Sequence, residues 1–175
     1  MTARNANRQI CSWGGMAMGQ NGVIDFRVET RAPQLAAAIR VAGDPDEIEA
    51  TMDSIEARVM SALEAQGVAP VGPSYWRYYE MSDTCFDYEV GFPIDQAVEE
   101  TGGIQLTSLP GGEIAVLTYR GHPDQTPDLY EAMEAWMEEN DRSPRDVPWE
   151  VYKSLPHDES ENWDDAVTEL HYPSK

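Results

Sequence analysis

The sequence predicts an α+β domain made of tandem duplicated strand-helix-strand-strand modules, related by pseudo-twofold symmetry around a central groove. The main observation is an apolar run closed by Gly-x-Pro-Asp at residues 37–46, which returns 78 positions later at residues 115–124. A second observation is that residues 88–93, Tyr-Glu-Val-Gly-Phe-Pro, match residues 168–173, Thr-Glu-Leu-His-Tyr-Pro. A duplicated module creates a seam, and positions where the two copies differ along that seam are candidates for function.

The first repeat opens with two extended segments. Residues 23–31 alternate apolar side chains such as Ile24 and Phe26 with polar ones, as a half-buried strand does. Pro33 interrupts this strand. The apolar run at residues 35–41 then predicts a second strand.

A helix is predicted next. Asp44 can cap its start, and Pro45 suits its first turn. Apolar residues then recur at helical spacing, and they are Ile48, Met52, Ile55, Val59 and Leu63. Gly67 predicts the end of the helix. Two β-like runs, residues 75–81 and 85–92, complete the order strand, helix, strand, strand.

The second repeat follows the same order. Glycines and prolines between residues 102 and 112 predict a linker made of turns. We expect a strand at residues 114–119 and then a helix that opens at Thr126. The apolar stripe of this helix consists of Leu129, Met133, Trp136 and Met137. Closing strands are predicted at residues 149–154 and 167–172.

Size and charge limit what the chain can bind. Its 175 residues suit a single domain, residues 23–175, in which repeats at about 24–95 and about 104–173 share one interior, because neither is large enough to be stable alone. A formal net charge of −20, from 12 Lys and Arg against 32 Asp and Glu, repels phosphate backbones and anionic membranes. We therefore expect neither a nucleic-acid partner nor a membrane partner.

The cellular compartment is inferred from cysteine use and from the N-terminal segment. Cys11 and Cys85 form neither a disulfide framework nor a metal-ligand spacing. No apolar run is long enough to span a bilayer, and residues 1–22 lack the order of a secretory signal. We expect a cytoplasmic protein. Residues 1–22, rich in Asn, Gln, Gly and Ser, are expected to be a disordered extension.

The most informative short segment surrounds Glu150. In an extended strand, Glu150 and Tyr152 point to one face and the residues between and before them point to the other. Aligning Tyr152 with Tyr78 of the first repeat places Glu150 opposite Trp76. Across the seam, this puts one carboxylate among three aromatic rings, and Tyr119 is a further candidate at a strand end.

A carboxylate in such surroundings has two obvious uses. It can pair with a flat, cationic ligand whose charge the rings also attract. With a pKa raised by desolvation, it can instead act as a general acid or base. Spacing alone also permits Glu150 to lie on an edge strand in water, with the rings as core. Glu89 and Glu169 occupy equivalent repeat positions, which favours a shared structural or surface role.

No metal and no cofactor are expected. His122, His157 and His171 have no ligand-like spacing, so we expect them on the surface or in loops. No Gly-rich loop has a dinucleotide or phosphate-binding pattern, and no Ser lies in a nucleophile elbow.

Four segments carry a family resemblance, and they are residues 72–79, 86–93, 115–121 and 149–152. The most specific pieces are Glu-Val-Gly-Phe-Pro, which begins at Glu89, and Glu-Val-Tyr, which begins at Glu150. Over about residues 24–173 the chain resembles the GyrI-like small-molecule-binding domain, which includes the effector-binding domains of AraC-type and MerR-type multidrug regulators. Family members often carry Gly-Pro-Tyr where this chain has Gly121-His122-Pro123.

The resemblance implies a central groove that binds bulky, often cationic aromatic molecules, with a groove glutamate that matches Glu150. Its walls would be Trp76, Tyr78, Tyr119 and Tyr152. We expect a stand-alone protein that binds a hydrophobic, cationic or aromatic small molecule of the multidrug or toxin type.

Two alternatives stay open. Some stand-alone members of the family are hydrolases that open strained cyclopropane rings of genotoxic natural products, and in such an enzyme Glu150 would be catalytic. Another member protects DNA gyrase, so a third hypothesis is a protein that binds a macromolecular partner such as a topoisomerase.

Overall fold

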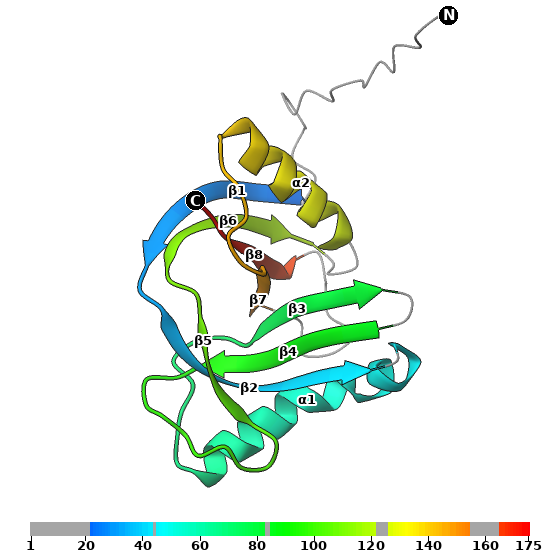
Figure 1. Cartoon of the computed structure of the whole chain (residues 1–175), viewed down its shortest axis with the longest axis vertical. Helices are drawn as coiled ribbons and strands as arrows, with labels where there is room; N and C mark the ends of the chain where they lie inside the picture. Colours follow the sequence, from blue (N-terminus) through cyan, green and yellow to red (C-terminus); the bar gives the residue numbers. More distant parts are fainter. Residues whose placement is uncertain (1–21, 44, 83–84, 122–125, 155–164) are drawn as a thin grey trace, which may run out of the picture.

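The computed structural model describes residues 22–43, 45–82, 85–121, 126–154 and 165–175 (Figure 1). The predicted disordered extension lies outside the described residues, except for Gly22 at its end. The helix cap at Asp44 lies outside them, as do Cys11, His122 and His157.

The described strands form one eight-stranded antiparallel sheet in the order β1-β6-β8-β7-β3-β4-β2-β5. Figure 1 shows this sheet curled into a half-barrel, with α1 and α2 on the outer side of the curl. The class is therefore α+β, as predicted. The strands are β1 (Gly22–Arg31), β2 (Gln34–Gly43), β3 (Tyr75–Ser82), β4 (Cys85–Pro93), β5 (Gln105–Leu109), β6 (Gly112–Arg120), β7 (Trp149–Ser154) and β8 (Val167–Pro173).

Each half of the chain contributes one edge strand to the part of the sheet that the other half forms. β1 pairs with β6 of the second half, with Phe26 opposite Leu117, and β5 pairs with β2 of the first half, with Thr107 opposite Ala36. In the middle of the sheet β3 meets β7, with Trp76 opposite Glu150. Two strand-helix-strand-strand runs are present, and their duplication and pseudo-twofold symmetry stay predictions.

The helices α1 (Pro45–Ala65) and α2 (Thr126–Glu139) each bury the described part of the predicted apolar stripe, with Trp136 only partly buried. The side chains of Ile48 and Met52 lie outside the described residues. Ile55, Val59 and Leu63 of α1 are fully buried in a cluster with residues of β2 and β4. Leu129, Met133 and Met137 of α2 pack with residues of β6 and β8. Each such side chain contributes roughly 1.5–3 kcal/mol by leaving water, so the two helices hold the outer face of the sheet in place.

Two glycines explain local features of the first half. Gly67 has φ +68°, and the amide of Val68 donates to the carbonyl of Leu63, so α1 ends at the glycine that predicts its stop. Gly91 lies in the Glu-Val-Gly-Phe-Pro run, and a Cβ there would fall 2.6 Å from the carbonyl oxygen of Ala37. A side chain at this position would push β4 away from β2.

The structure corrects the prediction for residues 102–112. The turns are present, but Gln105–Leu109 form β5 rather than a linker. In this strand only Leu109 is buried, and Leu106 is 37% exposed. An edge strand with one buried side chain has no apolar alternation for a sequence pattern to detect. None of the described helices is both long enough and apolar enough to cross a membrane.

Candidate functional site

The strand β7 divides its side chains between the two faces of the sheet, as predicted. Trp149 packs on the inner face with Tyr75 and Val116, and Val151 packs against the same cluster. Glu150 and Tyr152 lie on the outer, helix-covered face, where their side chains are hydrogen-bonded to each other. Because β7 lies at the centre of the sheet, Glu150 falls between the areas that α1 and α2 cover.

The carboxyl group of Glu150 is almost completely buried, with 3% of the residue exposed. The hydroxyl of Tyr130 donates to Oε1 at 2.8 Å, and that of Tyr152 donates to Oε2 at 2.7 Å. Among the residues that the structure describes, none forms an ion pair with this carboxyl group. Two neutral hydroxyl groups are therefore its partners.

Burial raises the pKa of Glu150, and the hydrogen bonds from Tyr152 and Tyr130 offset only part of that effect. The same environment acts on the phenols. Burial, followed by the charge of Glu150, raises the pKa of Tyr78, Tyr130 and Tyr152. These hydroxyls therefore stay protonated near neutral pH and remain hydrogen-bond donors.

Aromatic rings surround the carboxyl group on the side of β3 and β4. The ring of Trp76 is stacked on Tyr88 at 5.8 Å and meets Tyr152 edge-on at 6.2 Å. The ring of Tyr78 lies 6.4 Å from Trp76, and its hydroxyl is hydrogen-bonded to that of Tyr152. Trp76, Tyr78 and Tyr152 are each only partly buried, so each keeps some contact with solvent.

Four of the five residues predicted for the site lie together, and these are Glu150, Trp76, Tyr78 and Tyr152. Tyr119 shares their face of the sheet, because it is opposite Thr168, and Thr168 is opposite Tyr152. It is 2% exposed and packs in the cluster under α2. The ligand-binding role of all five stays a prediction.

The sequence analysis missed Tyr130 and Tyr88. Tyr130 lies on α2 next to Leu129, one position off the apolar stripe, so helical spacing alone does not distinguish it from a boundary residue. Tyr88 could have been found from the hairpin, because pairing β3 with β4 places it opposite Tyr78. Both additions increase the aromatic character of the surroundings of Glu150.

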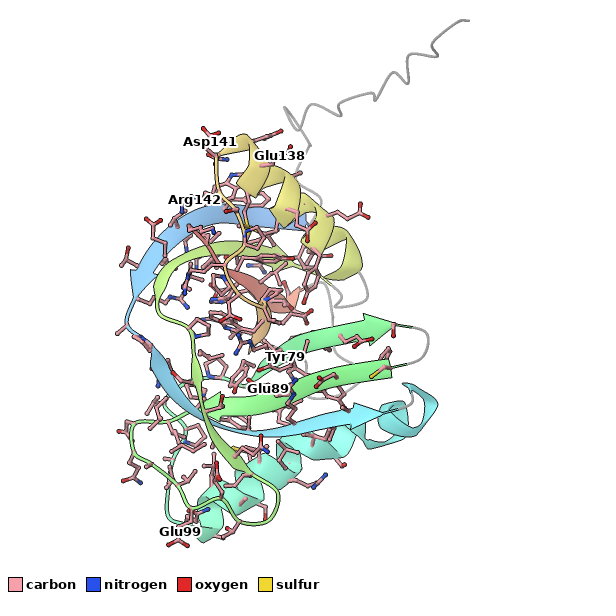
Figure 2. All side chains as sticks on the ribbon, viewed as in Figure 1. Tyr79, Glu89, Glu99, Glu138, Asp141 and Arg142 are labelled. Carbon is pink, nitrogen blue, oxygen red and sulfur yellow. The ribbon has the colours of Figure 1, made fainter. Side chains whose placement is uncertain are left out.

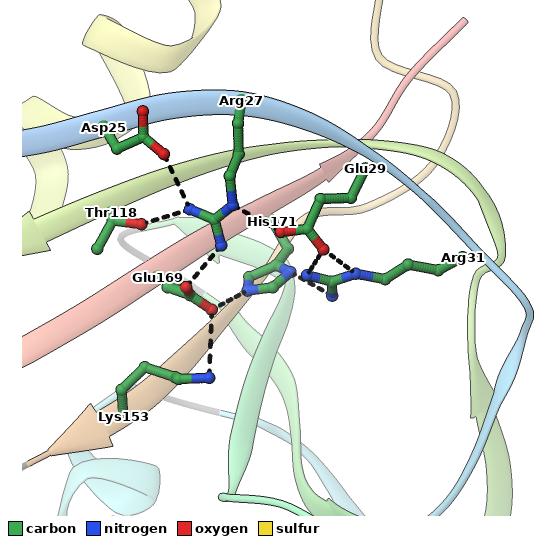
Figure 3. Close-up of polar contacts among 8 residues, drawn as sticks. All are labelled: Asp25, Arg27, Glu29, Arg31, Thr118, Lys153, Glu169 and His171. Carbon is green, nitrogen blue, oxygen red and sulfur yellow. Dashed lines mark hydrogen bonds and ion pairs between the residues drawn. The ribbon is translucent and has the colours of Figure 1, made fainter.

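The inner face of the sheet carries a different set of polar residues (Figure 3). Glu169 and Glu89 are 8% and 4% exposed, so of the two predicted roles, structural or surface, their burial favours the structural one. Figure 2 shows Glu89 and Tyr79 over β3 and β4, and Tyr75 donates to Glu89 at 3.2 Å. The prediction that His171 lies on the surface is wrong, since it is 2% exposed within β8.

His171 escaped prediction because isolated histidines are usually exposed, whereas this one is paired on both sides of its ring. Arg31 Nη1 lies 3.0 Å from Nδ1, and Glu169 Oε2 lies 3.2 Å from Nε2. Within the described residues, no group of three or more His, Cys, Asp or Glu side chains is placed to hold a metal ion.

Comparison with known proteins agrees with this architecture. The sequence profile of the GyrI-like small molecule binding domain matches residues 24–173. The crystal structure of the EcmrR C-terminal domain is 17% identical, with a TM-score of 0.72, and the match covers 86% of this chain and 97% of that one. The chain spans 57% of EcmrR as seen in its DNA complex.

Two further structures have the same fold. A hydrolase from Listeria innocua is 14% identical, with a TM-score of 0.61 and coverage of 86% of this chain and 91% of that one. SAV2435, bound to tetraphenylphosphonium, is 11% identical, with a TM-score of 0.60 and coverage of 87% and 94%. At these identities the likeness concerns the fold alone.

Proposed function

Because this chain belongs to the GyrI-like small-molecule-binding domain family, we propose that its outer-face site binds a flat, apolar and cationic small molecule. The observation that carries the proposal is Glu150, a buried acid whose described partners are neutral hydroxyls. Trp76, Tyr78 and Tyr152 would form the walls, and Tyr119 would extend them along the sheet. Tyr130 is added to the predicted set as a second donor to the acid.

The physical argument concerns charge. A buried carboxylate without a cation is costly, and that cost falls when a ligand supplies the opposite charge inside the same desolvated site. Aromatic faces attract a cation further, by roughly 0.5–2 kcal/mol per ring. The binding of tetraphenylphosphonium by SAV2435 supports a lipophilic cation as the ligand class.

We also attribute the site to a duplication of the strand-helix-strand-strand module. The strands β3 and β7 would be equivalent, and their contact would be the seam. At this seam Trp76 of the first half faces Glu150 of the second, so the halves differ where the ligand would bind.

The test is a calorimetric titration with tetraphenylphosphonium. The wild-type protein should bind one equivalent, and Glu150→Gln should weaken binding about tenfold or more, because the ligand loses a charge-assisted contact. Glu131→Gln is the matched control, since Glu131 is an exposed acid on the same helix as Tyr130. Equal affinities of the wild type and Glu150→Gln for tetraphenylphosphonium would contradict the role of Glu150 as the counter-charge.

A hydrolase is a second candidate function. The raised pKa of Glu150 favours a protonated carboxyl that could donate to a strained ring, and one protein of similar fold is a hydrolase from Listeria innocua. Excess of a cyclopropane-bearing alkylating agent, incubated with a trace of protein, separates the two functions. More than one equivalent of ring-opened product per protein supports turnover. If the protein sequesters at most one equivalent of the agent and forms no such excess of product, the result supports binding. A topoisomerase partner stays a prediction.

A further inference from the structure

The inner face of the sheet contains a pocket of about 500 Å³, on the opposite side from Glu150. It lies where β1 passes into β2 and where β5 passes into β6. Its size falls in the range of small-molecule sites. Its walls combine apolar side chains, among them Tyr75, Leu109, Trp149 and Val151, with the polar side chains of Arg31, Lys153, Glu169 and His171.

Two acceptor side chains that line this pocket, Glu169 and His171, are already hydrogen-bonded (Figure 3). Glu169 Oε1 accepts from Arg27 Nη2 at 2.7 Å, and Oε2 lies 3.2 Å from His171 Nε2. The hydrogen bond from His171, with Arg27 and Lys153, lowers the pKa of Glu169 to about 2. This carboxylate is therefore ionised and compensated within the protein.

The imidazole of His171 is occupied as well. Because Arg31 can only donate, Nδ1 accepts its hydrogen bond and Nε2 carries the proton that is donated to Glu169. Burial, with the charge of Arg31, lowers the pKa of His171 and keeps the ring neutral. The ring of Trp149 is stacked on it at 5.2 Å, which makes one flat wall.

The donor groups at the pocket have capacity to spare. A guanidinium has five N–H groups, and the described contacts of Arg31, to Glu29 and His171, use three of them. Lys153 Nζ lies 3.7 Å from Glu169, which is too long for a hydrogen bond, and its side chain is 47% exposed. Both cations line the pocket, so a ligand meets two positive donors beside a carboxylate and an imidazole that are already hydrogen-bonded.

We propose that this inner pocket binds a small organic anion, a carboxylate with an apolar body. The carboxylate would be held between Arg31 and Lys153, and the body would lie against Trp149, Val151 and Leu109. Arg31 presents a planar fork that matches carboxylate oxygens. The pocket would thus select the opposite charge from the Glu150 site, on the other face of the same strand, and it does not depend on that site.

The test uses 1-naphthoate as the probe, in calorimetric titrations at about 0.15 M salt, where long-range repulsion by the acidic surface is screened. The wild type should bind one equivalent, and neutral 1-naphthamide should bind at least about tenfold more weakly. Lys153→Gln should weaken naphthoate binding about tenfold. Lys175→Gln, a matched change at another exposed lysine, should leave it unchanged.

A second variant and a spectroscopic readout localise the probe. Val71→Glu places a negative charge at the rim, where Val71 is 53% exposed, and should also weaken naphthoate binding without harm to the core. Methyl resonances of Val151 and Leu109 should shift during the titration, while those of Leu117 and Leu170 on the outer face should not. Equal binding of naphthoate and naphthamide, or equal affinities of Lys153→Gln and Lys175→Gln, would overturn the proposal. Tetraphenylphosphonium binding tests the outer site separately.

Discussion

Glu150 and Glu169 lie on adjacent strands, β7 and β8, and both are buried, yet their surroundings are opposite in kind. Glu150 faces the helices among phenol hydroxyls and aromatic rings. Glu169 faces the inside of the curl, against Arg27, Lys153 and His171 (Figure 3). The pKa of the first is raised by burial, and that of the second is lowered to about 2 by its hydrogen bonds and charged neighbours.

This difference shows that burial alone does not identify a ligand-binding acid. A buried carboxylate that the protein has already neutralised contributes to the fold and offers a ligand little. A buried carboxylate with only neutral donors is destabilising until a cation arrives. The charged or neutral groups around each acid, rather than its extent of burial, therefore distinguish a structural glutamate from a candidate ligand-binding one.

The largest expected effect is on stability at Glu169. Glu169→Leu should lower the free energy of unfolding by about 2–3 kcal/mol at neutral pH, because Arg27 and His171 lose their shared acceptor. The pKa of this acid is depressed from 4.5 in the folded state, so the stabilisation is present above pH 4.5 and is lost as the pH falls toward about 2. Urea unfolding across this pH range measures both the loss of stability in the variant and its dependence on pH.

Glu29→Gln is the control for that experiment. Glu29 also pairs with Arg27, but about a third of its side chain is exposed (32%), so its loss should cost less. If Glu169→Leu lowers the free energy of unfolding no more than Glu29→Gln does, the structural role assigned to Glu169 is contradicted.

The next effect has the opposite sign. Glu150→Gln should raise the free energy of unfolding by about 1 kcal/mol at pH 7, since it removes a buried charge and keeps the shape. Because the folded pKa of Glu150 is raised, its contribution is favourable below pH 4.5 and is lost as the pH rises through that folded pKa. The advantage of the variant should therefore grow with pH, as thermal unfolding at several pH values would show. A variant less stable than the wild type at pH 7 would mean that the protein compensates this acid too.

The smallest effect is expected at Lys153. Lys153→Gln should change stability by less than about 0.5 kcal/mol, because its ammonium is half exposed and lies 3.7 Å from Glu169. The measurement is again urea unfolding, with Lys175→Gln beside it. If Lys153→Gln lowers the free energy of unfolding as much as Glu169→Leu does, then Lys153, and not Arg27, is the main partner of Glu169.

Most of the fold could be predicted from the sequence, because apolar spacing and turn residues mark each helix and nearly every strand. The strand β5 could not, since an edge strand with one buried side chain leaves no alternation. Glu150 and Trp76 were predicted to be opposite each other, and the register confirms it. That inference worked because β3 and β7 are adjacent in the sheet, whereas the duplication from which it started stays a prediction.

Contacts that depend on tertiary packing could not be predicted. Tyr130 reaches Glu150 from α2, and nothing in strand spacing reports how a helix is rotated above a sheet. His171 is buried because Arg31 of β1 and Glu169 occupy its two nitrogens, and Arg31 comes from 140 residues away in the chain. A pairing of that range has no local sequence signal.

The crossing of β1 and β5 also constrains how the polypeptide can be divided. A cut between Ile94 and Ile104 would give two fragments, and each would contain an edge strand whose partner, among the described strands, belongs to the other fragment. Neither piece would be expected to fold alone, although the two could reassemble when mixed. Since Gly22 is paired with Arg120, the N-terminal strand finds its place only after the second half is made, so this chain should fold slowly and late during synthesis.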